Sequence, residues 1–448
     1  MKYFFSGIGG IGMSSLALYT KYKGYDVAGS NNANSERTQY LKNKDIDISI
    51  GHSEENVKDA DLVIKSTAIK SDNPEILYAQ KNNITILNRM EYLNYILKTN
   101  YSIGITGTDG KTTTTAMISH ILKESGCNPT VFLGGIHDNL EDGNFRMGTG
   151  PIISEVDESD GFIRNTITDV SIITNLRPDH LEHYNNSFEN LIDSIYTHAS
   201  HAKDFVLLNG DDSILNVFND NLVVSFGSDD KSDYYFFNRQ PHGYYQTFEV
   251  NYKNKYVGMI KINLPGIHYA YDAIAAVAYA LEHGISFEKI QKALETFNSV
   301  NRRFNVLFKN SHIFVVDDYA HTPEEVEYTI KAAKEYFPDF PIIAIFQPHR
   351  YTRLFRNYKK FSQVLENADK VFVYRIYSAF EDPIDGVDER KMAKLITDSE
   401  FVDSENEMID RILDIENGVF LFLGAGDITN VAKKISKIFE KKYENAVS

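Results

Sequence analysis

The chain has 448 residues, which is enough for about three domains of ordinary size, each able to bury its own core. Its 46 basic and 62 acidic residues give a net charge of −16, which argues against a surface for nucleic acid or for an anionic membrane. The single cysteine, Cys127, excludes an intrachain disulfide and a cysteine-rich zinc cluster, and the absence of a long apolar run predicts a cytoplasmic protein without a signal peptide or membrane span.

The first predicted elements are a strand at 2–6, the sequence GIGGIG at 7–12 and a helix that follows it. This order matches the G-x-G-x-x-G fingerprint, whose backbone approaches a pyrophosphate. A second strand at 25–29 ends at Ser30-Asn31-Asn32, where a dinucleotide site would place an acid. We therefore expect a pyrophosphate ligand other than NAD; the alternative is that the glycines serve only a tight turn. The candidate residues for this ligand are Gly9, Gly10, Ile11, Gly12 and Ser30.

Two further strands are predicted at 61–66 and 83–87, so the first segment is an α/β unit that ends near residue 99.

The stretch YSIGITGTDGKTTTTAMISHIL, residues 101–122, predicts a short strand, a turn built on Gly107 and Gly110, and a helix opened by Lys111. The unpaired N–H groups of a first helical turn, with a lysine beside them, form a site for a phosphate. The strict pattern G-x-x-x-x-G-K-[ST] requires glycine where this chain has Ile105, so the loop is a shortened variant. The alternative is an ordinary strand-to-helix turn with a solvated lysine.

Polar clusters follow two later apolar strands, SEVDESD at 154–160 and TNLRPDH at 174–180. Ligands of open α/β sheets gather at the carboxyl ends of strands. Glu155 and the hydroxyl of Thr112 are hard oxygen ligands suited to Mg²⁺, and Glu155 with His180 forms a looser candidate for a second cation. Each residue alone is as readily explained as an exposed loop group.

In residues 233–262 apolar and polar side chains alternate and tyrosines are frequent, a pattern that predicts two or three antiparallel strands. A helix is predicted next, at 272–283. From Arg302-Arg303 onward, strands at 313–316, 342–346, 371–374 and 419–423 alternate with helices. This pattern predicts a second Rossmann-like unit without a phosphate loop of its own.

Eight motifs occur in the order found in the Mur ligases: GIGGIGMS, TGTDGKTTT, SEVDESD, TNLRPDHLEHY, NRRF, DDYAHTP, QPHRYTR and GAGD. The chain therefore resembles this family over nearly its whole length, and most closely the branch that adds L-alanine to UDP-N-acetylmuramate. The resemblance implies a three-domain α/β fold. It consists of a Rossmann-like UDP-sugar domain at 1–99, a central P-loop mononucleotide-binding domain at 100–301 and a Rossmann-like amino-acid-binding domain at 302–448.

The resemblance also implies roles for individual residues. Lys111 would hold the β,γ-phosphates of ATP, Thr112 and Glu155 one Mg²⁺, and Glu155 with His180 a second. The implied ATP-binding residues are Thr108, Asp109, Gly110, Lys111, Thr112, Thr113, Asp272, Arg303 and Asp318. The implied amino-acid site is Tyr319, His349, Arg350 and Arg353, and the implied catalytic residues are Lys111, His180 and Arg350. Asp317, Asp318, Tyr319 and His321 would face the nucleotide and the substrate.

Three positions depart from patterns within the family. Asp109 stands where this branch has histidine, and Tyr269 and Asp272 replace two asparagines, one of them expected near the adenine. Tyr269 could stack on a purine and Asp272 could accept a hydrogen bond from its amino group. Ser194 stands about where ligases of later steps carry a carbamylated lysine, which favours the alanine-adding branch.

The implied reaction places the γ-phosphoryl group of ATP on the carboxylate of UDP-N-acetylmuramate, after which the amine of L-alanine displaces phosphate. The expected protein is a monomer or homodimer that acts on these small molecules with ATP and Mg²⁺, without nucleic acid or membrane partners. The alternatives are a ligase for a recycled peptide, a nicotinamide dehydrogenase and a nucleotide-binding module without turnover.

Overall fold

The computed structural model describes residues 1–215, 218, 222–379 and 381–444. Its contacts group these residues into two compact units. The first contains Met1–Phe237, Val250–Gly258 and Asp272–Leu294. The second contains Asn238–Glu249, Met259–Tyr271 and the described residues from Glu295 onward. No helix in the described part of the chain combines the length and apolar character needed to cross a membrane.

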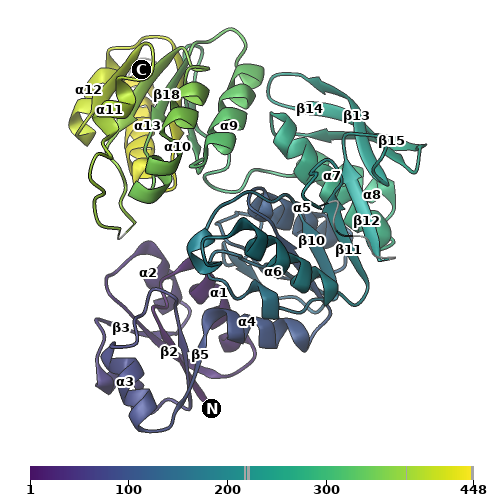
Figure 1. Ribbon diagram of the computed structural model, residues 1–448, viewed down its shortest axis with the longest axis vertical. Coiled ribbons are helices and arrows are strands. Elements are labelled where there is room, and N and C mark those ends of the chain that lie inside the picture. The colour runs from purple at the N-terminus through teal and green to yellow at the C-terminus, as the bar shows by residue number, and fades with distance from the viewer. Residues whose placement is uncertain (216–217, 219–221, 380, 445–448) are drawn as a thin grey trace. The chain divides into compact units, whose positions relative to one another are not determined.

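The amino-terminal sheet has five parallel strands in the order β3-β2-β1-β4-β5 (Figure 1). The strand order reverses between β1 and β4, so the loop after β1 lies at the switch point where ligands of such sheets bind. The strands are β1 (Lys2–Ser6), β2 (Asp26–Asn31), β3 (Asp47–Ile50), β4 (Leu62–Lys65) and β5 (Thr85–Asn88). The helices are α1 (Ile11–Tyr22), α2 (Glu36–Lys42), η1 (Glu54–Val57), α3 (Pro74–Lys81) and α4 (Arg89–Lys98).

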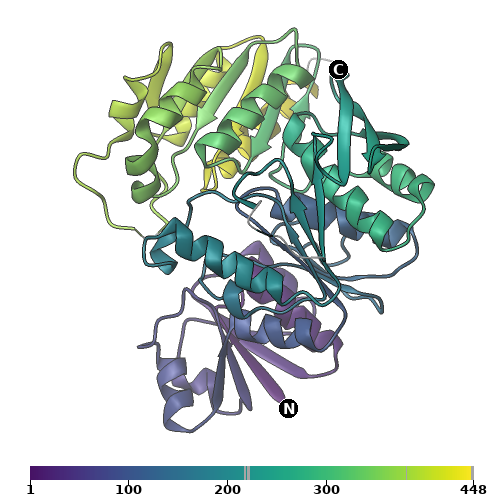
Figure 2. The same cartoon turned by 45° about the vertical axis from the view of Figure 1, so that its right-hand side comes forward.

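The central sheet has the order β15-β14-β13-β12-β11-β10-β6-β9-β7-β8, with β6 between β9 and β10. In both views α6 crosses in front of the central strands (Figure 1 and Figure 2). The strands are β6 (Ser102–Thr106), β7 (Thr130–Phe132), β8 (Phe145–Arg146), β9 (Ile152–Glu155), β10 (Val170–Ile173), β11 (Phe205–Asn209), β12 (Val223–Gly227), β13 (Tyr234–Pro241), β14 (Gln246–Tyr252) and β15 (Lys255–Ile262). The helices are α5 (Lys111–Glu124), η2 (Ile163–Asn165), η3 (Leu181–His183), α6 (Phe188–Ser200), α7 (Ile267–Glu282) and α8 (Phe287–Thr296).

The carboxyl-terminal sheet has six strands in the order β16-β17-β21-β18-β19-β20, of which only β16 is antiparallel to its neighbour. Its middle strands are continuous apolar runs because helices cover both faces of a parallel sheet. The strands are β16 (Asn305–Lys309), β17 (Ile313–Asp318), β18 (Ile342–Phe346), β19 (Lys370–Tyr374), β20 (Ser399–Val402) and β21 (Gly418–Leu423). The helices are α9 (Pro323–Tyr336), α10 (Tyr351–Leu365), α11 (Glu389–Ala393), α12 (Glu405–Leu413) and α13 (Ile428–Glu444).

These three sheets confirm the predicted α/β architecture, and β1 and β18 have the predicted bounds. The short strands β3 and β11 were not predicted. The domain limits at residues 99 and 301 stay a prediction.

A buried histidine lies on α6 inside the first unit. His198 is fully buried, and its Nδ1 donates a hydrogen bond to the carbonyl oxygen of Thr166 at 2.8 Å. Its Nε2 is buried without a hydrogen-bond partner. Burial lowers the pKa of His198 from 6.5 to about 4, because a charged imidazolium there would lose its hydration.

We therefore expect acid to destabilise this unit. An unfolded chain binds a proton at His198 below pH 6.5 and the folded chain does so only near pH 4, so stability falls as the pH is lowered through that interval. The expected loss is about 3 kcal/mol. Thermal melts between pH 7 and pH 4 measure it. His198→Asn should flatten the pH dependence, whereas the same change at the exposed His201 should not; equal slopes in both variants would contradict the assignment.

Candidate active site

The loop between β6 and α5 is shaped by two glycines with positive φ, Gly107 at 126° and Gly110 at 82°. A Cβ atom on Gly107 would overlap the Thr174 hydroxyl and approach the Asn175 carbonyl oxygen to 2.8 Å. The turn therefore excludes any side chain here and brings the first turn of α5 next to the loop backbone. This is the geometry that a phosphate needs at a helix N-terminus.

A second segment, residues 174–177, holds this loop in place. The Thr108 amide donates to the Asn175 carbonyl oxygen, and the Asp109 amide donates to Asn175 Oδ1, both at 3.0 Å. The Thr174 hydroxyl and Asn175 Nδ2 donate to the Asp109 carbonyl oxygen at 2.6 and 3.0 Å. Within the motif TNLRPDH the sequence predicted a role for His180 but none for Thr174 or Asn175. The polar pair after β10 was the available signal for Thr174 and Asn175.

Replacing Gly107 by alanine should impair the loop. We expect a lower melting temperature and at least about tenfold weaker binding of a nonhydrolysable ATP analogue, because the new Cβ atom collides with backbone and the φ of 126° is strained. Gly126→Ala is the matched control, since Gly126 has φ 88° but no atom within 4 Å of the added Cβ. Equal effects of the two substitutions on nucleotide binding would contradict a role of close packing at Gly107.

Lys111 is partly buried at the start of α5. Its Nζ donates to the carbonyl oxygens of Gly107 and Thr108 at 2.5 and 3.1 Å and lies 3.0 Å from an oxygen of Glu158. Burial alone would lower the pKa of Lys111, but Glu158 and Asp157 outweigh burial and raise it. The ammonium is therefore charged and aimed at the loop. Glu158 was not predicted; it belongs to the quoted SEVDESD motif.

Thr112 and Glu155 provide adjoining oxygen atoms. The Thr112 hydroxyl donates to Glu155 Oε2 at 3.0 Å, and the Gly134 amide donates to Oε1 at 2.5 Å. Burial raises the pKa of Glu155, while the Gly134 amide and Lys111 counteract that rise. A hydroxyl beside a carboxylate fits the hard oxygen ligands of Mg²⁺. Within the described ranges no group of three or more His, Cys, Asp or Glu side chains could hold a metal ion, so phosphate and water would complete such a shell.

His180 lies at the start of η3 with a left-handed backbone, φ 53°. Its ring nitrogens lie 3.5 Å from Asp179 and 3.8 Å from Glu182. The role of His180 as a ligand of a second cation stays a prediction.

Asp272 and Thr113 complete the surroundings of the loop. Asp272 is buried, accepts a hydrogen bond from the Thr114 hydroxyl at 3.1 Å, and occupies the space beside Gly110. Thr113 is buried within the first turn of α5. Asp272 thus packs against the phosphate loop, and its role toward adenine stays a prediction. Tyr269 is buried, and its ring centroid lies 4.1 Å from that of His268.

The glycine loop of the amino-terminal sheet lies before α1, whose N-cap is Gly10. Asn31 closes on this loop: its Oδ1 accepts from the Gly9 amide at 3.2 Å and its Nδ2 donates to the Ala33 carbonyl oxygen at 2.8 Å. Ser30 is fully buried, and its hydroxyl bonds to Glu75 at 2.8 Å and His52 at 3.0 Å. Ser30 thus already has internal partners, and its predicted contact with the sugar nucleotide stays untested.

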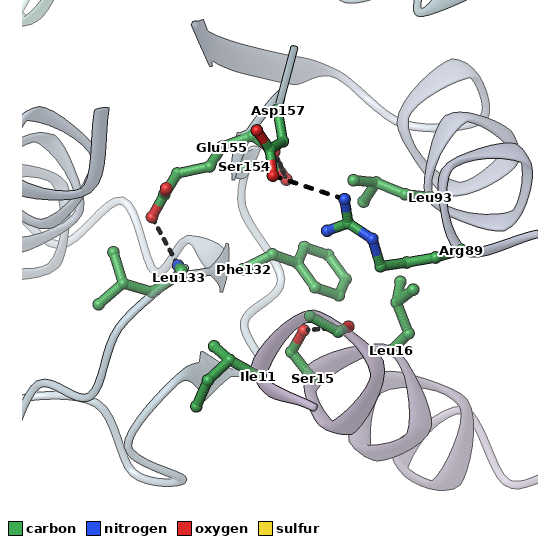
Figure 3. A pocket seen from close by; sticks show the side chains of 12 residues that line it. Ile11, Ser15, Leu16, Arg89, Leu93, Phe132, Leu133, Ser154, Glu155 and Asp157 are labelled. Atoms are coloured by element: carbon green, nitrogen blue, oxygen red, sulfur yellow. Dashed lines mark hydrogen bonds and ion pairs between the residues drawn. The ribbon is translucent and has the colours of Figure 1, made fainter. Parts of the chain in front are cut away.

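A cavity of about 200 Å³ lies between α1 and the carboxyl end of β9 (Figure 3). In Figure 3 Arg89 points toward Asp157, and the two side chains lie 3.7 Å apart. The Glu155 carboxylate accepts a hydrogen bond from the Gly134 amide. The first turn of α1 and the Glu155 carboxylate therefore line the same cavity. Its lining is formed by Ile11, Gly12, Ser15, Leu16, Arg89, Leu93, Phe132, Leu133, Gly134, Ser154, Glu155 and Asp157.

In the second unit, Asp318 and Glu325 organise the loop after β17. Asp318 accepts from the amides of Phe304 and Ala320, and burial raises its pKa to about 6. Glu325 accepts from the His321 amide at 2.9 Å, and its carboxylate lies 3.0 Å from His321 Nδ1 and 3.6 Å from Arg303. Asp317 accepts from the Thr429 hydroxyl at 2.6 Å. Asp317 and Asp318 are buried and Glu325 is partly buried, and all three are acceptors that position this loop and its neighbours.

His349, Arg350 and Arg353 form a second cluster in this unit. His349 stacks on Tyr377 with centroids 5.5 Å apart, lies 5.8 Å from the His321 ring, and its Nδ1 accepts from Arg353 at 3.1 Å. Burial and the neighbouring cations lower the pKa of His349 to about 3, so its ring is neutral at pH 7. Arg350 has φ 69° immediately before α10, a strained conformation of the kind that occurs at functional sites.

Tyr319 lies under two arginines, with the guanidinium carbons of Arg302 and Arg303 at 4.7 and 5.0 Å from its ring centroid. The second unit therefore brings together Arg303, Asp318 and Tyr319, and also His349, Arg350 and Arg353. The first unit brings together Lys111, Thr112 and Glu155, and their roles stay a prediction.

Three family models match the chain in succession. They are described as "Mur ligase family, catalytic domain" at residues 2–101, "Mur ligase middle domain" at 105–280 and "Mur ligase, glutamate ligase domain" at 302–426.

Curated relatives match over the full length. A UDP-N-acetylmuramate–L-alanine ligase of Thermotoga neapolitana is 41% identical, covering 97% of this chain and 96% of the relative. One of Aquifex aeolicus is 37% identical, with 97% of each covered.

Solved structures are similar as well. The UDP-N-acetylmuramate-alanine ligase MurC from Thermotoga maritima has a TM-score of 0.88 at 37% identity, covering 99% of this chain and 100% of that chain. A murein peptide ligase from Psychrobacter arcticus has a TM-score of 0.70 at 20% identity, covering 97% and 98%, which is a likeness of fold alone.

Proposed function

Because the chain belongs to the Mur ligase family, we propose that it is an ATP-dependent ligase joining L-alanine to the carboxylate of UDP-N-acetylmuramate, with release of ADP and phosphate. The observation that carries the proposal is the convergence of Lys111, Thr112 and Glu155 at the start of α5. The full-length relatives that bear this name support the choice of substrates. Such a reaction belongs to peptidoglycan precursor synthesis.

The charges of the reactants explain what the first unit does. A carboxylate is a poor electrophile and both it and the γ-phosphate are anions, so cationic groups must offset their repulsion. The loop amides and Lys111 would hold the β,γ-phosphates of ATP, and the cavity beside α1 would bring the sugar-linked carboxylate to the same place. The carboxylate oxygen would then attack the γ-phosphorus, forming an acyl phosphate and ADP.

Mg²⁺ is the metal that the oxygen donors fit, with Thr112 and Glu155 as the residues that would hold it and His180 as a candidate at a second ion. Bound there, the ion would neutralise charge on the transferring phosphoryl group.

The second unit would supply the amino acid. A neutral His349 beside Arg353 and Arg350 suits a zwitterion, because the arginines can pair with its carboxylate while the amine stays free to attack the acyl phosphate. Tyr319, held against two arginines, would lie at the same site. Arg303 and Asp318 would face the nucleotide.

The alternatives have weaker support. The peptide-ligase likeness stands at 20% identity, and the Asn31 amide closes the glycine loop where a dinucleotide site would have an acid. Ser194 is buried, and its hydroxyl donates to the carbonyl oxygen of Asn190 in its own helix. It therefore offers no carboxylate of the kind that a carbamylated lysine provides in ligases of later steps.

The test is phosphate release from ATP by the purified chain with UDP-N-acetylmuramate, alone and with each member of an amino-acid panel. Release that requires both the sugar nucleotide and L-alanine, with a product of the summed mass less water, is expected. Release only with a peptide, or none with any amine, would refute the proposal.

We also propose a cytoplasmic location, where ATP is available, and a monomeric or homodimeric state, which sedimentation will distinguish.

A further inference from the structure

A loop of the central sheet is fastened to the amino-terminal helices of the same compact unit. The loop, residues 133–144, joins β7 to β8 and carries Asp142, which is buried. One oxygen of Asp142, Oδ1, accepts from the Tyr40 hydroxyl at 2.6 Å, from Lys44 Nζ at 2.8 Å and from the Tyr22 hydroxyl at 3.2 Å. We call Asp142 and these three donors the latch. The buried carboxylate depends on the ammonium and the two phenols, because without these partners its buried negative charge would be uncompensated.

Asn144, two residues further along the loop, reaches the first turn of α1. Its Nδ2 donates to the Ile11 carbonyl oxygen at 2.6 Å and to the Ser14 hydroxyl at 3.0 Å. Arg37 bonds to the Asp142 carbonyl oxygen at 2.9 Å and to the Ser14 hydroxyl at 2.9 Å. The latch thus lies next to the first turn of α1, the helix start that would receive the pyrophosphate of the sugar nucleotide.

The other end of the loop touches the candidate metal ligand. The Gly134 amide donates to Glu155 Oε1, whose second oxygen accepts from Thr112. One segment of twelve residues therefore contacts the helix of the glycine loop at its end and the carboxylate beside the phosphate loop at its beginning.

Apolar packing supports the same connection. The Tyr19 ring lies 5.5 Å from that of Phe132, and the Tyr22 ring stacks on Phe145 at 6.0 Å. Phe132 and Phe145 flank the loop on both sides, and they share one buried core with residues of α1 and β1. The loop thus has rigid neighbours at both ends.

We propose that Asp142 is a positioning residue that, through the 133–144 loop, sets the separation between the first turn of α1 and Glu155. The inference rests on the proposed function, because that separation is what brings the acyl carboxylate of the sugar nucleotide to the γ-phosphate of ATP. Each half-site keeps its own ligand contacts without the latch, but the reacting atoms are no longer aligned. Misalignment of about 1 Å can cost about a hundredfold in rate.

The test compares Asp142→Ala with wild type. We expect kcat for ligation to fall about tenfold, while the Kd of an ATP analogue and that of UDP-N-acetylmuramate, each measured by calorimetry, change less than about threefold. Hydrogen exchange at the amides of residues 133–145 should become faster, and this readout needs no turnover. Tyr40→Phe removes one hydroxyl but leaves the Lys44–Asp142 ion pair, so kcat should fall by less than in Asp142→Ala. This variant replaces Asp142→Ala in the test if Asp142→Ala does not fold.

Glu55→Ala is the matched control, because its ion pair with Lys58 is exposed and lies within η1 and its C-cap. A latch variant with wild-type kcat, or with a lowered melting temperature as its only change, would overturn the proposal. If wild type itself does not ligate alanine, the proposed function fails. The exchange experiment then still decides whether Asp142 fastens the loop.

Discussion

Lys111→Met should ligate at least about a thousandfold more slowly than wild type. Lys111 places a full positive charge among the loop carbonyls, and removal of a preorganised charge from a phosphoryl-transfer site costs about this much. The effect should be on kcat and on the binding of the triphosphate, measured by phosphate release and by calorimetry.

Glu158 complicates this substitution. It is buried against Lys111, so the methionine leaves a carboxyl group without its partner, and a broken buried pair can cost about 3–5 kcal/mol. The double variant Lys111→Met/Glu158→Gln separates folding from catalysis. We expect it to melt close to wild type and to remain inactive, whereas recovery of ligation in the double variant would contradict the phosphate assignment of Lys111.

Glu155→Gln should lose about a hundredfold in kcat and need more Mg²⁺ for half-maximal activity. Glutamine keeps an oxygen that can accept from the Gly134 amide but lacks the negative charge that favours a divalent cation. A Mg²⁺ titration of phosphate release measures both effects.

Asp193→Asn is the control for the loss of one carboxylate in the same unit, since Asp193 is exposed and pairs with the exposed Arg164 outside the 133–144 loop. It should behave as wild type. Wild-type Mg²⁺ dependence in Glu155→Gln would remove Glu155 from the proposed metal site.

The order and chemistry of the site follow from local sequence. Gly107, Gly110 and Lys111 lie within five consecutive positions, so strand, turn and helix start are specified by neighbours in the chain. The same holds for β18 and the residues that follow it, because a continuous apolar run bounded by polar residues identifies a buried strand. Motif order over the chain was sufficient to identify the family.

Other features depend on segments far apart in the chain. Glu158 meets Lys111 across 47 positions, Asn175 meets the phosphate loop across 66, and Tyr40 meets Asp142 across 102. The sequence by itself determined the three α/β segments, the two glycine loops and the lysine at a helix start, because each arises from contacts within a few residues. Only the tertiary structure decided which acids are buried beside that lysine and which loop fastens α1, because burial and pairing energies act between surfaces that folding brings together.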